Sequence, residues 1–343
     1  MTLSDRARFN AVLDVRSPSE FAEDHLPGAE NFPVLDDAQR AEIGTLHKQV
    51  SPFAAKRRGA AYVSANIARY LETAWQDQPK DWRPLVVCWR GGQRSGSLVT
   101  VLRSVGWEAG QLEGGYKAFR TQVLADMQTL PAAFQYRVLM GRTGSAKTRI
   151  LQAIAEQGGQ VLDLETLARH KGSVLGAWPG QPQPSQKAFE TALWQSFQGF
   201  DPARPVYLEA ESPKIGALRV PDTLLTAMHQ SPCIAIEVSV SARVDFLLMD
   251  YAYAQTEPTT LCRQLDVLRP LRGHEVVNQW QDWIKAGAFA ALTESLLVTH
   301  YDPLYTASLG RHFGENPQVT TLVSERLEAE DIMALAQQAL SQG

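Results

Sequence analysis

Two short apolar runs, each followed by a glycine-containing loop and then by helix-forming residues, constrain the fold of this chain most. The first run is Pro84–Val87, which leads into Cys88, and the second is Tyr136–Met140, which leads into Gly141. A strand that feeds a loop and then a helix is the unit from which parallel sheets are built. We therefore expect an α/β protein with parallel sheets.

The loop after the first run has the composition of an anion-binding thiolate site. Cys88 stands at the end of the expected strand, and the two glycines that follow allow backbone N–H groups to turn toward one oxyanion. Arg94 and a helix beginning near Ser95 add positive potential, which favours the reactive thiolate. The alternative is a buried structural cysteine, which needs no arginines beside it. The expected oxyanion-binding residues are Arg90, Gly91, Gly92, Gln93, Arg94 and Ser95.

The loop after the second run matches a phosphate-binding P-loop, because a strand precedes it and a helix-forming segment follows. We expect Lys147 to reach terminal phosphates, Thr148 to ligate magnesium and the loop amides to hold the remaining oxygens. Ala146 stands where the pattern has glycine, which crowds the backbone and disfavours ordinary nucleotide hydrolysis. The expected diphosphate-binding residues are Gly141, Thr143, Gly144, Ser145, Ala146, Lys147 and Thr148.

A further apolar run, Pro205–Leu208, ends in Glu209, with Glu211 two residues later. Either carboxylate could hold magnesium or form part of a second phosphate site beside the P-loop. Either could equally be a charge at the end of a strand that faces water. The sequence therefore gives a possible magnesium site and no firm metal site.

Length and pattern indicate two domains. The chain has 343 residues, more than one small core needs. We expect a parallel-sheet domain at 1–128 and a P-loop domain at 129–343, with a helix-rich segment at about 241–295 and a late strand at 296–299.

Composition excludes several classes of protein. A net charge of −4 argues against a generally basic nucleic-acid-binding surface, so any RNA-binding groove is local. Three cysteines at unrelated spacings suggest neither a disulfide framework nor a zinc site. No apolar run approaches the ~20 residues that span a bilayer. We expect a cytoplasmic protein with no membrane partner.

Residues from about 10 to 120 resemble the rhodanese superfamily. The resemblance rests on the Cys88 loop and on the segments Leu13–Phe21, His25–Ala29, Asn31–Val34, Gly106-Trp107 and Leu112–Tyr116. Five residues separate Cys88 from Arg94, one more than is usual in sulfurtransferases and the same as in phosphatases of this fold. A phosphatase or sulfurtransferase fused to a regulatory P-loop module is therefore an alternative function, although Val87 replaces a histidine common in such phosphatases. An RNA-binding adaptor with two inactive folds is a third possibility.

Nearly the whole chain resembles the tRNA 2-selenouridine synthases. The order of the two domains carries this resemblance, together with the segments Asp163–Glu165, His170–Ser173, Ser185–Glu190, Glu209–Gly216 and His300–Tyr305. The family implies replacement of sulfur by selenium in 2-thiouridine at the tRNA wobble position, with selenophosphate as donor. It also implies an S-geranyl-2-thiouridine intermediate made from geranyl diphosphate.

The resemblance also implies roles for residues and partners. Cys88 would carry selenium as S-selanylcysteine, and no cofactor would be tightly bound apart from possible magnesium. The partners would be the anticodon stem-loop of tRNA and selenophosphate synthase, which supplies the donor. Geranylation needs no ATP, so we favour an isoprenoid diphosphate in the P-loop. An apolar channel should then lie nearby. The aromatic candidates for it are Trp178, Phe189, Trp194 and Phe197, although the spacing of Phe189, Leu193 and Phe197 equally fits the core face of a helix.

Overall fold

The computed structural model describes residues 1–173, 175–178, 180–312 and 318–342, and its parallel sheets and covering helices confirm the α/β fold. The chain divides into two compact units. The first contains Met1–Gln128 and Pro184–Gln195, and the second contains Thr129–Gln183 and Ser196–Gly343. The predicted boundary at residue 128 lies between them, but the prediction did not assign residues 184–195 to the first unit.

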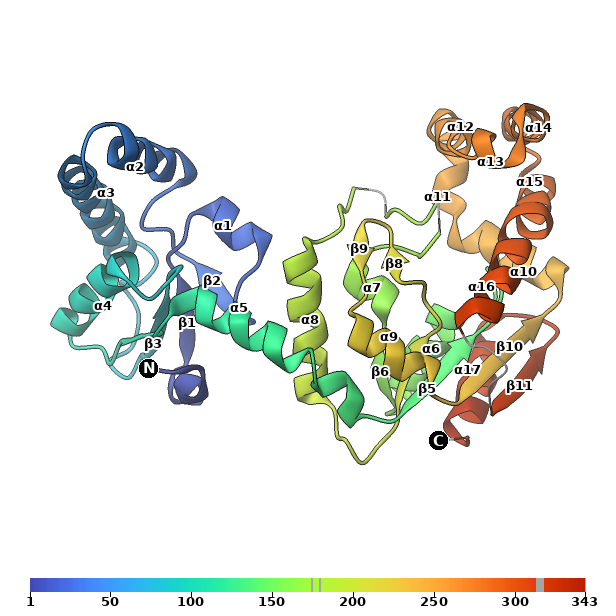
Figure 1. Cartoon of the computed structure of the whole chain (residues 1–343), viewed down its shortest axis with the longest axis horizontal. Helices are drawn as coiled ribbons and strands as arrows, with labels where there is room; N and C mark the ends of the chain where they lie inside the picture. Colours follow the sequence, from blue (N-terminus) through green and yellow to red (C-terminus); the bar gives the residue numbers. More distant parts are fainter. Residues whose placement is uncertain (174, 179, 313–317, 343) are drawn as a thin grey trace. The chain divides into compact units, whose positions relative to one another are not determined.

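The first unit is built on a four-stranded sheet of order β2-β1-β3-β4, in which every pair is parallel (Figure 1). The apolar run Pro84–Val87 forms one of its two central strands and is fully buried, as expected of a parallel strand covered on both faces. The strands are β1 Ala11–Asp14, β2 Ala29–Asn31, β3 Pro84–Val87 and β4 Gly110–Gln111. The helices are η1 Leu3–Arg8, α1 Pro18–Glu23, α2 Asp37–Gln49, α3 Pro52–Glu72, α4 Gln93–Val105 and α5 Gly115–Asp126.

The second unit is built on a five-stranded parallel sheet of order β11-β10-β5-β7-β6. Leu139 in β5 pairs with Glu209 in β7, so the P-loop and Glu209 leave the sheet side by side at its carboxyl edge. Ligands of open α/β sheets bind at this edge. The strands are β5 Tyr136–Met140, β6 Gln160–Leu162, β7 Val206–Glu209, β10 Cys233–Val238 and β11 Val319–Ser324, with a hairpin of β8 Lys214–Ile215 and β9 Leu218–Arg219.

Helices form most of the rest of this unit, and α12, α13 and α14 lie together (orange in Figure 1). Of these, α12 and α14 share a core with α15 around Trp280, which is fully buried. The helices are η2 Leu130–Ala133, α6 Lys147–Glu156, α7 Leu164–Ala168, α9 Asp222–His229, α10 Val240–Asp250, α11 Ala252–Gln255, α12 Pro258–Asp266, α13 Arg269–Arg272, α14 His274–Lys285, α15 Phe289–Leu296, η3 Leu297–Tyr301, α16 Asp302–His312 and α17 Ala329–Leu340. Helix α8, Gln186–Gly199, begins in the first unit and ends in the second.

The predicted late strand at 296–299 is wrong. Helix α15 ends at Leu296, and the π-helix η3 continues from Leu297 to Tyr301 before α16 begins. Leu296, Leu297 and His300 are all buried, at spacings that suit a helix. A short apolar run cannot by itself distinguish a strand from a buried helix. The helical segment therefore extends well beyond residue 295, and the last strand is β11.

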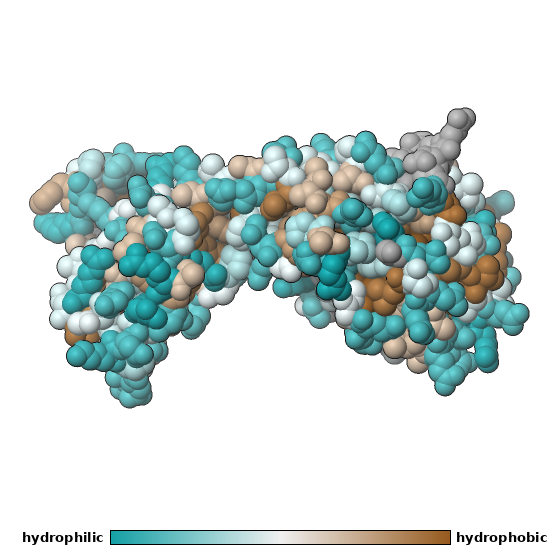
Figure 2. Space-filling view, turned by 90° about the horizontal axis from the view of Figure 1, so that it is seen from below, coloured by the Kyte–Doolittle hydropathy of each residue, from teal (hydrophilic) through white to brown (hydrophobic). Residues whose placement is uncertain are grey.

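Hydrophilic and near-neutral residues cover most of the face drawn in Figure 2, and hydrophobic residues occupy separate patches. Among the described residues, no helix combines the length and the apolar character needed to cross a membrane.

Candidate functional site

The Cys88 thiol lies directly after β3, at the base of its loop, and the residue is 3% exposed. The Gly92 N–H donates to Cys88 Sγ at 3.3 Å, and Ser95 Oγ lies 3.0 Å from the same sulfur. Helix α4 begins at Gln93, so its first turn adjoins the thiol as the sequence predicts. Amide, hydroxyl and helix terminus all stabilise negative charge on sulfur.

Close backbone contacts hold the loop in this shape. Gly91 has a φ of +63°, and a Cβ there would overlap the carbonyl oxygen of Leu112. Gly115 has a φ of +58°, and a Cβ there would overlap the carbonyl oxygen of Cys88. The Tyr116 N–H donates to that carbonyl at 2.8 Å. The loop is therefore fastened to the turn before α5, and only glycine fits at either contact.

Gln111, in the two-residue strand β4, contributes to the thiol site, although no sequence signal marked it. Its Nε2 donates to the carbonyl oxygens of Gly91 at 2.7 Å and Gly92 at 3.0 Å. It also lies 2.9 Å from Ser95 Oγ, to which it donates. Because Ser95 accepts from Gln111, the single hydroxyl hydrogen of Ser95 is available to the sulfur or to the Gly92 carbonyl.

Arg94 does not act as an unpaired cation. Its guanidinium donates to both carboxylate oxygens of Glu20, at 2.6 and 3.3 Å. Partial burial raises the pKa of Glu20, but the hydrogen bonds and charge of Arg94 outweigh it and hold that pKa below its usual value. Arg90 is exposed and makes no hydrogen bond or ion pair with the described residues. The guanidinium available to an anion in this loop is therefore that of Arg90, with Gln93 exposed beside it.

The P-loop joins β5 to α6, and all seven residues predicted to bind diphosphate line one pocket of about 700 Å³. Lys147 Nζ donates to the Gly141 carbonyl oxygen at 2.9 Å, which folds the side chain back over the loop. Ala146 has a φ of +58°, in the left-handed region. The glycine that the P-loop pattern has at this position would adopt that conformation without strain. The P-loop geometry therefore forms despite the substitution.

Three carboxylates gather next to Thr148, with ligand oxygens within 4.8 Å of one another. They belong to Glu165, Glu209 and Glu211, and Thr148 Oγ1 donates to Glu165 at 2.8 Å and to Glu209 at 3.2 Å. Glu209 is fully buried, so it is not a strand-end charge that faces water. Glu165, in α7, was absent from the predicted site, although it stands in one of the segments that carried the family resemblance.

The pKa values of these carboxyl groups are all raised. Burial, followed by the charge of Glu165, raises the pKa of Glu211 to about 8 and that of Glu209 well above its usual value. Burial also raises the pKa of Glu165, although Lys147 opposes it. Oxygen ligands so close together fit a hard divalent cation, which would relieve their mutual repulsion. Magnesium therefore fits the donor set of Thr148 and the three carboxylates.

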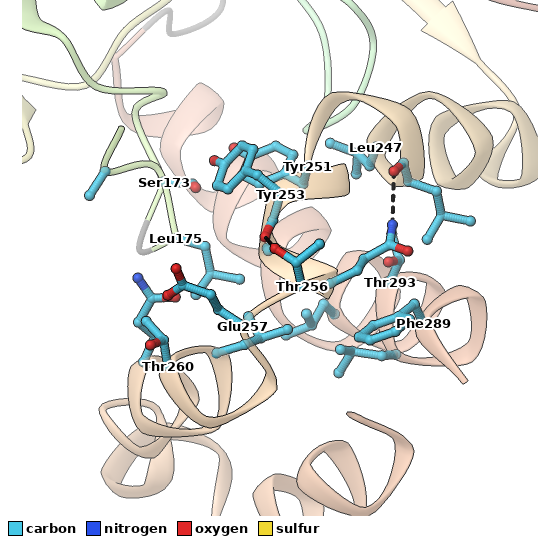
Figure 3. Close-up of a pocket in the computed structure, with 18 of the residues that line it drawn as sticks. Ser173, Leu175, Leu247, Tyr251, Tyr253, Thr256, Glu257, Thr260, Phe289 and Thr293 are labelled. Carbon is cyan, nitrogen blue, oxygen red and sulfur yellow. Dashed lines mark hydrogen bonds between the residues drawn. The ribbon is translucent and has the colours of Figure 1, made fainter. Parts of the chain in front are cut away.

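A second, apolar pocket of about 390 Å³ continues from the P-loop pocket. Leucines and aromatic residues of α10, α15 and η3 line it, and Figure 3 shows Leu247 and Phe289 among them. Glu257 and Thr260 lie on another side of this pocket, from the start of α12. The residues that line both pockets are Thr143, Ser173, Trp178, Leu247, Tyr251 and Tyr301.

Of the four aromatic residues predicted for an apolar channel, Trp178 lines these pockets. Phe189 and Phe197 are buried to 0% and 2% exposure and belong to the core, as the alternative interpretation held. Trp194 donates its indole N–H to Asp126 at 2.7 Å. The sequence could not place the channel because its walls come from helices far from the P-loop in the chain.

A buried arginine connects these helices to the P-loop. Arg243, in α10, is 1% exposed and donates to the Thr143 carbonyl oxygen at 3.1 Å. Its two terminal nitrogens each lie 2.8 Å from a carboxylate oxygen of Asp302. The P-loop, α10 and the start of α16 are thereby fixed to one another.

Comparison with known proteins agrees with both units. Residues 2–122 match the model of the rhodanese-like domain, and residues 134–266 match that of the tRNA 2-selenouridine synthase AAA domain. Proteins named tRNA 2-selenouridine synthase are 33% identical over 335 residues in Alcanivorax borkumensis and 31% identical over 361 residues in Bdellovibrio bacteriovorus. These alignments cover 88% and 93% of this chain and 90% and 93% of those proteins. With a thiolate loop, a P-loop and end-to-end similarity to these relatives, the chain belongs to the tRNA 2-selenouridine synthase family.

Proposed function

We propose that this protein modifies tRNA by replacing the sulfur of 2-thiouridine at the wobble position with selenium. The names of its relatives support tRNA as the substrate. In this proposal the P-loop unit first geranylates the sulfur, and the Cys88 loop then supplies selenium. The anticodon stem-loop is the part of the tRNA that enters, and selenophosphate synthase provides the selenium donor.

The continuity of the two pockets in the second unit carries the first step. The P-loop offers amides, Lys147 and Thr148 to a diphosphate, and the apolar pocket begins at residues that line both cavities (Figure 3). A geranyl diphosphate has this same division, with a charged head and a hydrocarbon tail. Burial of that tail against leucine and phenylalanine side chains is favourable by about 25 cal/mol per Å². A nucleotide would instead place a polar sugar next to its phosphates.

The geranyl transfer balances without a redox partner. The sulfur of 2-thiouridine attacks C1 of the geranyl group, the bond between C1 and the diphosphate oxygen breaks, and the base releases its N3 proton to water. Negative charge collects on the departing diphosphate, where Lys147 and the loop amides stabilise it. Magnesium, held by Thr148 and the neighbouring carboxylates, would supply further positive charge to the same oxygens.

The selenium step uses the first unit. The loop amides and Arg90 are the groups we assign to the oxygens of selenophosphate, and Cys88 is the residue we assign to carry selenium as S-selanylcysteine. Alkylation prepares the base, because a geranylthiolate leaves C2 more readily than an unmodified sulfur does. The Cys88 thiolate attacks the selenium of selenophosphate, the phosphorus–selenium bond breaks, and phosphorus leaves with the bonding electrons as phosphite. The outer selenium then bonds to C2 as the bond between C2 and sulfur breaks and geranylthiolate departs. A thiol reductant finally cleaves the remaining sulfur–selenium bond, which leaves a mixed disulfide on Cys88 and releases 2-selenouridine.

The two steps can be separated with a pre-geranylated tRNA and nucleoside mass spectrometry. We expect Lys147→Ala to lose geranylation of 2-thiouridine tRNA and still convert pre-geranylated tRNA to 2-selenouridine. Cys88→Ser should geranylate 2-thiouridine tRNA but fail to convert pre-geranylated tRNA to 2-selenouridine. Lys285→Ala, which changes an exposed lysine of α14, and Cys262→Ser are the matched controls, and both should keep both steps.

Each assignment can fail by itself. Normal geranylation by Lys147→Ala, or a requirement of the wild type for ATP turnover, would overturn the isoprenoid assignment. Unchanged 2-selenouridine formation by Cys88→Ser would overturn the role of the thiol. Rapid hydrolysis of an aryl phosphate, or sulfur transfer from thiosulfate to cyanide, without any change in tRNA would favour the phosphatase or sulfurtransferase alternative.

A further inference from the structure

His300 stands out among the residues of the P-loop pocket because its ionisation and tautomer are both fixed. It lies in the π-helix η3, is 1% exposed, and lines the pocket together with Lys147 and Thr148. Short π-helical turns occur often at functional sites. The function proposed above gives His300 no role.

Arg272 determines where the imidazole proton resides. Its Nε donates to His300 Nδ1 at 3.0 Å, and its Nη2 donates to the His300 carbonyl oxygen at 3.2 Å. A guanidinium can only donate, so Nδ1 must be the accepting nitrogen and the proton of a neutral ring lies on Nε2. Burial, and then the charge of Arg272, lower the pKa of His300, so the ring is neutral near pH 7.

The remaining nitrogen is free to bind a ligand. His300 Nε2 makes no hydrogen bond with the described residues, and it is not among their fully buried polar atoms that lack a partner. The N–H therefore borders accessible space. His300 is among the residues that line the P-loop pocket, the cavity in which phosphates would bind.

The surrounding contacts hold this donor close to the phosphate-binding backbone. Two residues after His300, Asp302 pairs with Arg243, which in turn donates to the Thr143 carbonyl oxygen of the P-loop. The same helical segment continues to Tyr305, which also lines the pocket. His300 is thus tied to the P-loop through buried contacts and through its own helix.

We propose that His300 is a further catalytic residue, a neutral N–H donor to the diphosphate that leaves during geranyl transfer, and that Arg272 is its positioning residue. The inference rests on the proposed function for the identity of the anion. The proton remains on Nε2 throughout. The hydrogen bond strengthens as the bond between C1 and oxygen breaks, because the diphosphate oxygens then gain negative charge. A fixed neutral donor needs no protonation step at the pH of the reaction.

The test measures geranylation of 2-thiouridine tRNA with geranyl diphosphate. His300→Phe should lower kcat by about 100- to 1,000-fold, in the manner of a lost oxyanion donor. It should leave the conversion of pre-geranylated tRNA to 2-selenouridine at the wild-type rate. His300→Gln keeps an amide donor and should recover part of kcat. His274→Phe, the same change at an exposed histidine, is the control and should match the wild type.

Arg272→Met tests the positioning role. Burial still lowers the pKa of His300 in this variant, but the opposing charge of Arg272 is gone, so the titration of His300 seen in kcat should move to higher pH than in the wild type. A wild-type kcat in His300→Phe, or a wild-type pH profile in Arg272→Met, would overturn the inference. If the wild type forms no S-geranyl product, the proposed function fails instead. In that case, the affinities of the wild type and of His300→Phe are measured for inorganic diphosphate and for ATP. A ligand that binds the variant more weakly is one that the histidine contacts. If the variant binds both ligands as tightly as the wild type does, the donor role is overturned.

Discussion

Arg243, which is buried, and Asp302, whose side chain is 14% exposed, form a two-point ion pair with both nitrogen–oxygen distances at 2.8 Å. The pair lies between α10 and the start of α16, and Arg243 also donates to the P-loop carbonyl of Thr143. The ion pair therefore connects the wall of the apolar pocket to the P-loop.

We expect Asp302→Ala to destabilise the protein by about 3–5 kcal/mol, because it leaves the buried guanidinium of Arg243 without its counter-charge. Urea unfolding followed by circular dichroism measures the change. Arg142 also faces Asp302, at 3.6 Å, but is 55% exposed, so Arg142→Ala should cost no more than about 1 kcal/mol. If Asp302→Ala and Arg142→Ala lower the free energy of unfolding equally, the pair of Arg243 and Asp302 is not the main stabilising contact of Asp302.

Gln111→Leu should loosen the Cys88 loop. The substitution removes the donor to two loop carbonyls and to Ser95. Ser95 is fully buried, and a buried group that loses its partner costs about 1–3 kcal/mol. We expect slower formation of 2-selenouridine and a changed rate of Cys88 alkylation by iodoacetamide, with geranylation unaffected. Gln122→Leu, at an exposed position of α5, is the control. Wild-type alkylation and selenium transfer in Gln111→Leu would show that the loop holds its shape without this amide.

The carboxylate cluster predicts opposite effects of pH with and without magnesium. The pKa of Glu211 is about 8 in the folded protein against a usual value of 4.5, so the folded state binds more protons between these values. Stability without metal should therefore fall as pH rises from about 5 to 8. Magnesium requires the deprotonated carboxylates, so its stabilising effect should grow over the same range. Melting temperatures in EDTA and in magnesium measure both trends.

Glu211→Gln provides the control for this prediction. The substitution removes one titrating group, so the melting temperature in EDTA should fall less steeply as pH rises. Magnesium should also raise the melting temperature by less than in the wild type. An unchanged pH dependence in this variant would assign the effect to other groups.

Under the proposed geranyl transfer, Phe289→Ala should change which isoprenoid diphosphate is accepted. Phe289 lines the apolar pocket from the start of α15 but does not line the P-loop pocket (Figure 3). Removing its ring enlarges the space for the tail and leaves the diphosphate contacts in place. The ratio of kcat/KM for farnesyl over geranyl diphosphate should rise by roughly 10-fold. A ratio that stays at the wild-type value would place the tail elsewhere.

The sequence predicted the parts of this molecule that local pattern determines. The strand before Cys88, the P-loop and the start of α4 were predicted from short runs of residues, because those residue types favour only a few backbone conformations. Glu20 was not predicted as the partner of Arg94, because 74 positions separate the two and only the sheet topology brings them together. The same holds for Gln111, whose strand has only two residues, and for the apolar pocket, whose walls depend on tertiary packing.

The assignment of residues 184–195 to the first unit has a consequence for how the chain is made. Thr191 donates to the buried carboxylate of Asp24 at 3.0 Å, Lys187 pairs with Glu23 at 2.6 Å, and Arg120 pairs with Glu190. When residue 128 leaves the ribosome, these partners have not been synthesised. The first unit can reach its final packing only after β5, the P-loop, α6 and β6 have emerged. During synthesis from the N-terminus, the first unit is therefore completed only when part of the second unit has already left the ribosome. A chain that stops at residue 128 lacks three of the polar contacts of the first unit.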